Sequence, residues 1–251
     1  MPRQFLYILM LLVAVHGAGC ASQPMGLVAS NMDAEARPVP MAPLAESLFK
    51  ADQAVLSNAE IDRILTAKIV PPEHTRLRVI RVGERYPFRH GWWSPQTLQL
   101  EQQALDGLLA KLRASPRVGD AQVVPTLLTP PVTTIPYLRE AAARMQGDVL
   151  LVYRLFTQNF QREGWFGNDK VRAVCTAEAL LLDTRTGIVM DAAVATAPFP
   201  STRTQKDMSF EETIARAEEE ATAKALLQLG DKLAEFFNSA PAPDKIAQTD
   251  H

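Results

Sequence analysis

The chain has 251 residues, of which 26 are Lys or Arg and 28 are Asp or Glu, so its formal net charge is −2. Hydrophobic residues account for 47% of the chain and charged residues for 22%, with 18 Pro, 12 Gly and 2 Cys. This composition excludes a disordered polymer, a collagen and a disulfide-stapled mini-protein, because it supplies enough apolar side chains for a packed core. The charge balance gives no general affinity for polyanions, so nucleic acid is not expected as a partner.

The N-terminus has the pattern of a secretory signal peptide. Arg3 precedes an apolar run from Phe5 to Val15, and Gly17, Ala18 and Gly19 form a small-residue cleavage region. The run is shorter than the roughly 20 residues that span a bilayer, and no other segment reaches that length. We therefore expect residues 1–19 to be removed and the mature chain to have no transmembrane helix.

Cys20, directly after Ala18 and Gly19, resembles the lipobox cysteine of bacterial lipoproteins. In that class the cysteine becomes the first residue of the mature chain and carries acyl chains such as palmitate. The resemblance implies a lipid-anchored protein. By resemblance to lipoprotein sorting in Gram-negative bacteria, Ala21 in place of an aspartate implies the periplasmic face of the outer membrane and not the inner membrane. An ordinary secretory signal with an incidental Cys20 is the alternative.

The second cysteine, Cys175, has no partner for an internal disulfide once Cys20 is acylated. It lies in a run of alternating apolar residues. We expect it to be buried in the core and to have no catalytic or redox role.

Composition divides the mature chain into three parts. Residues 20–43 are rich in Pro, Ala and Ser without periodicity and predict a flexible, lipidated tether. Residues 44–237 carry regular apolar patterns and predict a single α/β domain. Residues 238–251 predict a disordered tail.

Within the predicted domain, segments with strand periodicity and segments with helix periodicity follow one another. The expected strands are 75–82, 121–128, 148–160, 170–182 and 188–197. The expected helices are 44–53, a helix from Ser57 ended by Pro71, one from Ser94 that stops before Pro116, one from Thr134 to Met145, and a long one from Ser209.

Local signals refine several of these elements. Pro125 interrupts its strand and predicts an edge position or a bulge. Gly147 is the expected C-terminal signal of the helix before it. Residues 183–187 form a short polar turn that ends in glycine, so the two strands around it are expected to pair as an antiparallel hairpin. The resulting order, β-α-β-α-β-β-β-α, predicts an α/β fold (mixed α+β) with one mixed five-stranded sheet and helices packed on it.

Two local patterns resemble a domain shared by envelope lipoproteins. One is Gly147-Asp148 followed by four apolar residues, and the other is the hairpin sequence from Ala179 through Asp183 to Gly187. This domain occurs in the curli-secretion channel lipoprotein, the lipoprotein activators of peptidoglycan synthases and the N-terminal domain of the Tol-Pal translocation protein. The resemblance covers about residues 75–237. It implies a non-enzymatic module that docks on another envelope protein.

Catalytic and metal-binding patterns are weak. His74 and His90 have no second ligand at metal-binding spacing on a common element. Glu178, Asp183 and Asp191 lie on or beside the hairpin, where solvent-facing and turn-forming roles explain them. We therefore expect no enzyme activity, no cofactor and no metal.

Aromatic and arginine residues gather in two segments that follow the first and third expected strands. If these strands are parallel, both segments leave the carboxyl edge of the sheet, where open α/β sheets usually bind ligands. Trp and Arg are also enriched among interface hot spots. The candidate binding residues are Arg85, Arg89, His90, Trp92, Trp93, Arg162, Trp165 and Phe166.

The alternative for these aromatic residues is a packing role, with Trp92 and Trp93 folded back over a helix end and Trp165 and Phe166 closing a turn. The first functional hypothesis is a non-enzymatic lipoprotein of the cell envelope that binds another envelope protein. A receptor for a small ligand or a glycan is the second hypothesis, and an envelope hydrolase is the third.

Overall fold

The computed structural model describes residues 48, 56–67, 69–83, 95–129, 133–162 and 169–241. These residues all belong to one compact unit, Ala34–His251. The expected signal peptide, the tether, the helix over 44–53 except Leu48, and the tail from residue 242 lie outside the described residues. None of the described helices combines the length and hydropathy that a membrane span requires.

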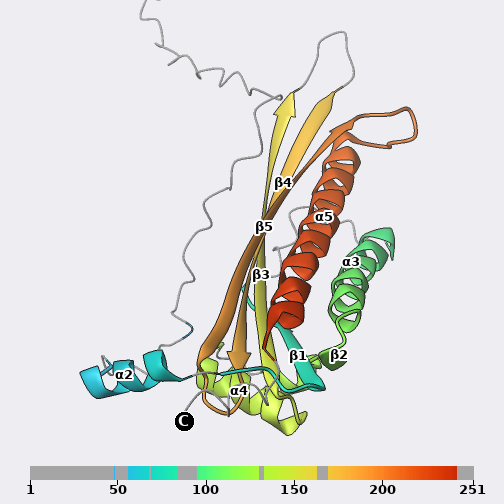
Figure 1. The fold of residues 1–251 in the computed structure, drawn as a ribbon. Helices are drawn as coiled ribbons and strands as arrows, with labels where there is room; N and C mark the ends of the chain where they lie inside the picture. The colour runs from blue at the N-terminus through green and yellow to red at the C-terminus, as the bar shows by residue number, and fades with distance from the viewer. Residues whose placement is uncertain are drawn as a thin grey trace, which may run out of the picture. The chain divides into compact units, whose positions relative to one another are not determined.

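A mixed five-stranded sheet with the order β2-β1-β3-β4-β5 forms the centre of the fold (Figure 1). β1, β2 and β3 are parallel, whereas β4 is antiparallel to both β3 and β5. The strands are β1 (Thr75–Arg81), β2 (Val118–Val123), β3 (Val149–Arg162), β4 (Lys170–Asp183) and β5 (Val189–Thr202). The predicted α/β class, with one mixed five-stranded sheet, is confirmed.

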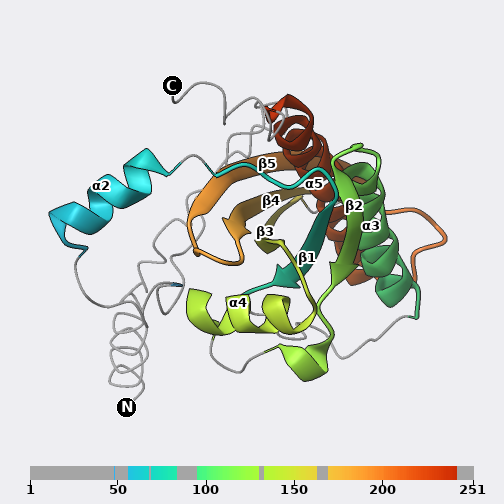
Figure 2. The ribbon, with the colours of Figure 1, turned by 60° about the horizontal axis from the view of Figure 1, so that its bottom comes forward.

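Helices lie on both sides of this sheet (Figure 2). Those in the described part of the chain are α2 (Asn58–Thr66), α3 (Pro95–Arg113), α4 (Ile135–Arg144), α5 (Phe210–Ser239) and the short 3-10 helix η2 (Thr126–Leu128). From β1 onward the order of strands and α-helices is the predicted one. α5 includes residues 238 and 239, which were predicted to belong to the disordered tail, because the helix continues to Ser239.

The two faces of the sheet have separate cores because successive side chains of a strand point to opposite faces. α3 and α5 cover the first core, which includes Leu77, Val79, Leu151 and Cys175. On the other face, α4 packs over a smaller core that includes Leu150, Val152 and Leu182. α4 therefore covers only one end of β3, a strand that continues to Arg162.

β2 is displaced from its predicted position. It runs from Val118 to Val123 instead of 121–128, and residues 126–128 form η2. Pro125 has no N–H to donate, so the ladder ends before it and the chain turns. The predicted edge position is confirmed, because β2 is the first strand of the sheet.

The end of α4 also differs from the prediction. Gln146, not Gly147, adopts the left-handed backbone, with φ of 56°. Gly147 instead lies against Arg78, where a Cβ atom would be only 2.3 Å from Arg78 Cγ. A glycine is needed here for close approach, not for the helix terminus.

The predicted turn between β4 and β5 is confirmed. The Asp183 Oδ2 atom accepts hydrogen bonds from the Thr186 N–H (2.7 Å) and the Thr186 hydroxyl (2.6 Å). Gly187 has φ of +77°, a conformation that favours glycine. Arg139 of α4 fastens the turn from outside, since its Nε donates to the Thr184 carbonyl at 2.9 Å.

Replacing Ser209 with alanine is expected to cost about 1 kcal/mol of the free energy of unfolding. The Ser209 hydroxyl accepts from the Glu212 N–H (3.4 Å), and Glu212 Oε2 accepts from the Met208 N–H at 2.8 Å. Ser57→Ala is the matched control, because Ser57 caps α2, which has no buried residue. Urea denaturation should show a loss for Ser209→Ala and almost none for Ser57→Ala. Equal losses of stability in the two variants would contradict a stabilising role for the Ser209 cap.

Candidate functional site

The structure describes only one of the predicted binding residues. Arg162 is the exposed last residue of β3, where it pairs with Lys170 of β4. The other predicted residues lie outside the described residues: Arg85, Arg89, His90, Trp92, Trp93, Trp165 and Phe166.

The two segments that contain these residues begin at different positions along the strand direction of the sheet. β1 and β3 are parallel, as the prediction required, and Arg81 at the end of β1 is opposite Tyr153. β3 continues for nine more residues to Arg162, which at ~3.3 Å per residue is roughly 30 Å. Both segments therefore follow the carboxyl ends of parallel strands, but their starting points are far apart along β3.

Beyond the end of the sheet that α4 covers, toward Arg162, β3, β4 and β5 present another surface, which we call the open face. It consists of side chains of β3, β4 and β5 that point away from α5 and lie outside the two core clusters, although Val174 and Thr176 at its centre are themselves buried. Its cross-strand rows are Arg154–Glu178–Val194, Phe156–Thr176–Thr196, Gln158–Val174–Pro198 and Phe160–Arg172–Pro200.

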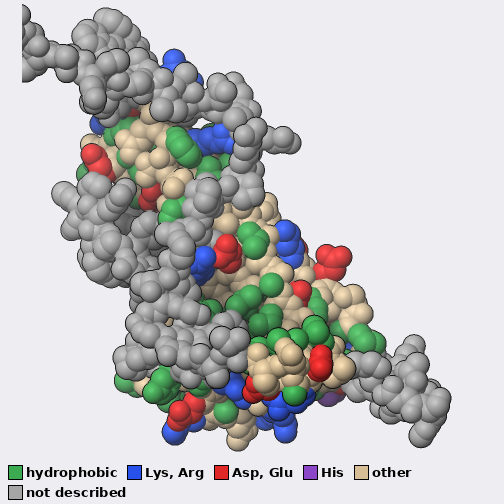
Figure 3. Space-filling model, turned by 90° about the vertical axis from the view of Figure 1, so that its left-hand side faces the viewer, with side chains coloured by type: hydrophobic (Ala, Val, Ile, Leu, Met, Phe, Trp, Pro, Cys, Tyr) green, Lys and Arg blue, Asp and Glu red, His purple; other side chains and the backbone are tan. Residues whose placement is uncertain are grey.

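The open face has an apolar character. Phe160 is 44% exposed and Val194 is 46% exposed, although both lie on regular strands. Phe156 and Pro198 are half-buried and Pro200 is exposed. Figure 3 views the molecule from its left-hand side in Figure 1, and hydrophobic side chains appear there among polar ones. Contiguous exposed apolar patches mark interaction sites, whereas single exposed apolar side chains are normal.

Two pairs of polar residues contact each other across strands on the open face. Arg154 Nη2 is 2.8 Å from Glu178 Oε2, and Arg154 Nε donates to the same oxygen at 2.9 Å. The hydroxyl groups of Thr176 and Thr196 are 3.1 Å apart. The Arg154–Glu178 pair balances its own charges, so contact with this part of the face depends on shape and apolar area.

The free edge of β5 is protected against strand addition. Lys232 Nζ donates to the Val194 carbonyl at 2.6 Å, so this carbonyl points away from β4. Alternate residues of a strand point the same way, which places Pro198 and Pro200 at the same outer edge without an N–H to donate. A partner of this region is therefore expected to contact side chains of the open face, not the backbone of β5.

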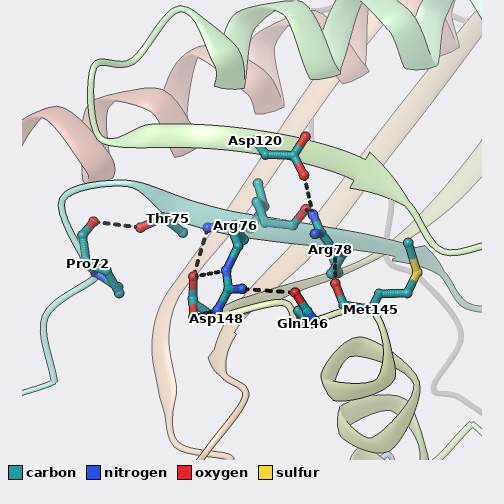
Figure 4. A network of polar contacts seen from close by, with 9 residues as sticks. Pro72, Thr75, Arg76, Arg78, Asp120, Met145, Gln146 and Asp148 are labelled. Atoms are coloured by element: carbon teal, nitrogen blue, oxygen red, sulfur yellow. Dashed lines mark hydrogen bonds and ion pairs between the residues drawn. The ribbon is translucent and has the colours of Figure 1, made fainter.

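A polar network fastens the opposite end of the sheet (Figure 4). Asp148 accepts from Arg76 Nε (2.9 Å) and Nη2 (2.8 Å), and Arg76 holds the pKa of this carboxyl below its usual value. The buried Arg78 donates to Asp120 at 2.8 Å and to the Met145 carbonyl at 3.0 Å. These contacts join β1 to β2, to β3 and to the end of α4, and they explain Asp148 as a structural residue.

The acidic residues of the hairpin have no catalytic arrangement in the described structure. Glu178 pairs with Arg154, and Asp183 holds the turn. Within the described ranges, no group of three or more His, Cys, Asp and Glu could hold a metal ion. A depression of about 200 Å³ lies between α3 and α5, below the range of ~300–1,000 Å³ typical of ligand sites.

Cys175 is fully buried, as predicted, and burial raises the pKa of its thiol. In a Cys20→Ser chain, where Cys175 is the only thiol, we expect a thiol reagent to react very slowly with the folded protein and fast in denaturant. Reaction of the folded protein at the denatured rate would contradict the core assignment.

No model of a known protein family matches the chain, and no curated protein matches it. Its fold is similar to several solved structures at low identity. A dodecameric PelC variant from Paraburkholderia phytofirmans is 16% identical with a TM-score of 0.33, over 65% of this chain and 95% of that one. A minor lipoprotein from Acinetobacter baumannii is 12% identical with a TM-score of 0.35, over 67% of this chain and 97% of that one.

Lipoprotein GNA1162 from Neisseria meningitidis is 11% identical with a TM-score of 0.31, over 60% of this chain and 99% of that one. The chain is thus similar, at low identity, to bacterial lipoproteins. These values assign neither a function nor a partner. The likeness to the three lipoprotein groups named from the sequence stays a prediction.

Sequence reasoning missed the open face. Its signal is the alternation along 154–160, where every second residue belongs to this face. The predicted strand over 188–197 ends before Pro198 and Pro200, whereas β5 continues to Thr202 and adds both prolines to this face.

Proposed function

We propose that the protein is a non-enzymatic, lipid-anchored accessory protein of the bacterial cell envelope that docks another envelope protein on the open face. The exposure of Phe160 and Val194 on the three-stranded part of the sheet formed by β3, β4 and β5 carries this proposal. Phe160 and Val194 are each a little under half exposed, so a partner that buries the rest of either side chain gains about 1 kcal/mol.

The size of the open face indicates how far the contact must extend. Four rows on three strands span roughly 20 Å by 10 Å, well below the ~800 Å² that each partner buries in a standard interface. The interface must therefore continue beyond the rows. Arg162 lies at the end of β3, next to Phe160, and leads directly to Trp165 and Phe166 in the sequence.

We therefore include the sequence-predicted residues in the proposed interface. Arg162, Trp165 and Phe166 would extend the contact from the end of β3. Arg85, Arg89, His90, Trp92 and Trp93 would contribute from the segment after β1. Trp and Arg side chains supply large contact area and directional hydrogen bonds, which suits them to the centre of an interface.

The test is photo-crosslinking in the intact envelope. A photoreactive residue at Phe160 or Val194 should give the same discrete protein adduct, whereas one at Gln228, exposed on α5, should not. Adducts of equal yield from all three positions, or none from the open face, would reject a protein-docking role. Capture of a glycan at Phe160 without a protein adduct would favour the receptor alternative.

The anchor is tested separately. Mass spectrometry of the mature N-terminus is expected to show acylation at Cys20, and Cys20→Ser is expected to release the protein from membranes. An unmodified amino group on any other first residue would show an ordinary secretory signal.

A further inference from the structure

Leu48 shows where the N-terminal chain meets the described structure. Its side chain is half-buried against the core under α4. Its carbonyl accepts a hydrogen bond of 2.6 Å from the N–H of Ile135, the first residue of α4. This N–H is one of the donors that a helix cannot satisfy internally, so the bond is a specific attachment. The chain is thus fastened on the same side of the sheet as the open face.

The residues before Leu48 have a length that matches this face. Residues 34–47 are fourteen residues, which reach roughly 40 Å as an extended polyproline-type chain. The rows of the open face run from Arg154 to Phe160, roughly 20 Å along β3. They begin two residues beyond Val152, which belongs to the same core as Leu48. The segment can therefore reach every row from its attachment point.

The chemistry of the segment matches as well. It contains three prolines, Pro38, Pro40 and Pro43, together with Val39 and Met41. Proline-rich segments dock on surfaces that present aromatic side chains, and they lose little conformational entropy on binding. The open face presents Phe156 and Phe160 to such a chain. Prolines have no N–H, so the segment does not need the protected edge of β5.

We propose that residues 34–47 dock along the open face of the same chain and occupy the site of the protein partner. Attachment at Leu48 gives the segment a high effective concentration, so weak contacts are sufficient to hold it. Only the competition with the partner rests on the proposed function, because docking of the segment needs no partner.

Disulfide trapping in the full chain tests the docking. In a Cys20→Ser background, where the buried Cys175 is the remaining thiol, Met41→Cys is combined with Val194→Cys or, as the matched control, with Gln228→Cys. The intramolecular disulfide of the Val194 pair is expected to form at least tenfold faster than that of the Gln228 pair under mild oxidation. Equal rates would overturn the proposal, and so would disulfides that form only between two molecules.

Photo-crosslinking from Val194 separates this proposal from the proposed function. A Val39→Asp, Met41→Asp chain should give several-fold more partner adduct if the segment competes with the partner. An unchanged adduct yield would overturn the competition. A fast Met41–Val194 disulfide without any partner adduct would support docking of the segment and reject the proposed function. A partner adduct together with equal disulfide rates would support the proposed function and reject docking of the segment.

Discussion

Gly147→Ala is expected to lower the free energy of unfolding by about 3 kcal/mol. A Cβ atom at this position would lie 2.3 Å from Arg78 Cγ and 3.2 Å from the Ala142 carbonyl oxygen. Arg78 cannot move away cheaply, because its side chain is only 6% exposed and donates to Met145, Leu77 and Asp120. Any shift would break hydrogen bonds of a buried charge, which is a large cost.

Gly107→Ala is the matched control for this substitution. In α3, a Cβ atom at residue 107 would meet the tip of Leu227, at 3.0 Å. Leu227 is partly exposed and can rotate, and alanine favours a helix by about 1 kcal/mol over glycine. Urea denaturation should show stability unchanged or raised for Gly107→Ala. A Gly147→Ala variant as stable as the parent chain would show that the contact with Arg78 relaxes freely.

Asp207→Asn is expected to cost about 3 kcal/mol of stability at neutral pH. The carboxylate is 2% exposed in the turn between β5 and α5, and it forms an ion pair with Arg216. It also accepts from the Thr204 N–H (2.7 Å) and from the hydroxyl groups of Thr204 (3.1 Å) and Thr213 (3.0 Å). An amide would remove the charge that Arg216 requires and would place an NH₂ group among donors.

The pH dependence of stability gives a second readout at Asp207. Arg216, ahead of the other partners, holds the pKa of this carboxyl well below its usual value. A carboxyl whose folded pKa is depressed adds stability above its unfolded pKa, and this contribution is lost as the pH falls. With an unfolded pKa of about 3.9, the difference between the parent chain and Asp207→Asn should shrink by about 1 kcal/mol from pH 7 to pH 3.

Asp231→Asn is the control for Asp207→Asn. Asp231 is 59% exposed and pairs with Lys111 on the surface, so its loss should change stability by no more than about 0.5 kcal/mol. The measurement is urea denaturation of the three chains at both pH values. A difference between Asp207→Asn and the parent chain that stays constant with pH would contradict a depressed pKa at Asp207.

Local interactions were readable from the sequence without a structure. The turn at Asp183 depends on hydrogen bonds between residues three apart, and the cap at Ser209 also depends on residues three apart. The apolar run around Cys175 predicted a buried strand by its alternation, and Pro125 predicted an edge strand by its missing N–H. Such signals determined the order of elements and the sheet class.

Contacts between distant segments needed the tertiary structure. The bonds that align β1 with β3 join Arg76 and Asp148, which are 72 positions apart. This register sets the stagger between the ends of the two strands, and no local pattern encodes it. Pairing of β1 with β3 also places Arg78 of β1 against Gly147. The requirement for a glycine at residue 147 therefore comes from a side chain on another strand. The open face likewise exists only because α4 covers one end of β3 and β5 continues past Pro198. Sequence periodicity determined which residues share a face, but only the packing of the helices decided which part of that face no helix of the described chain covers.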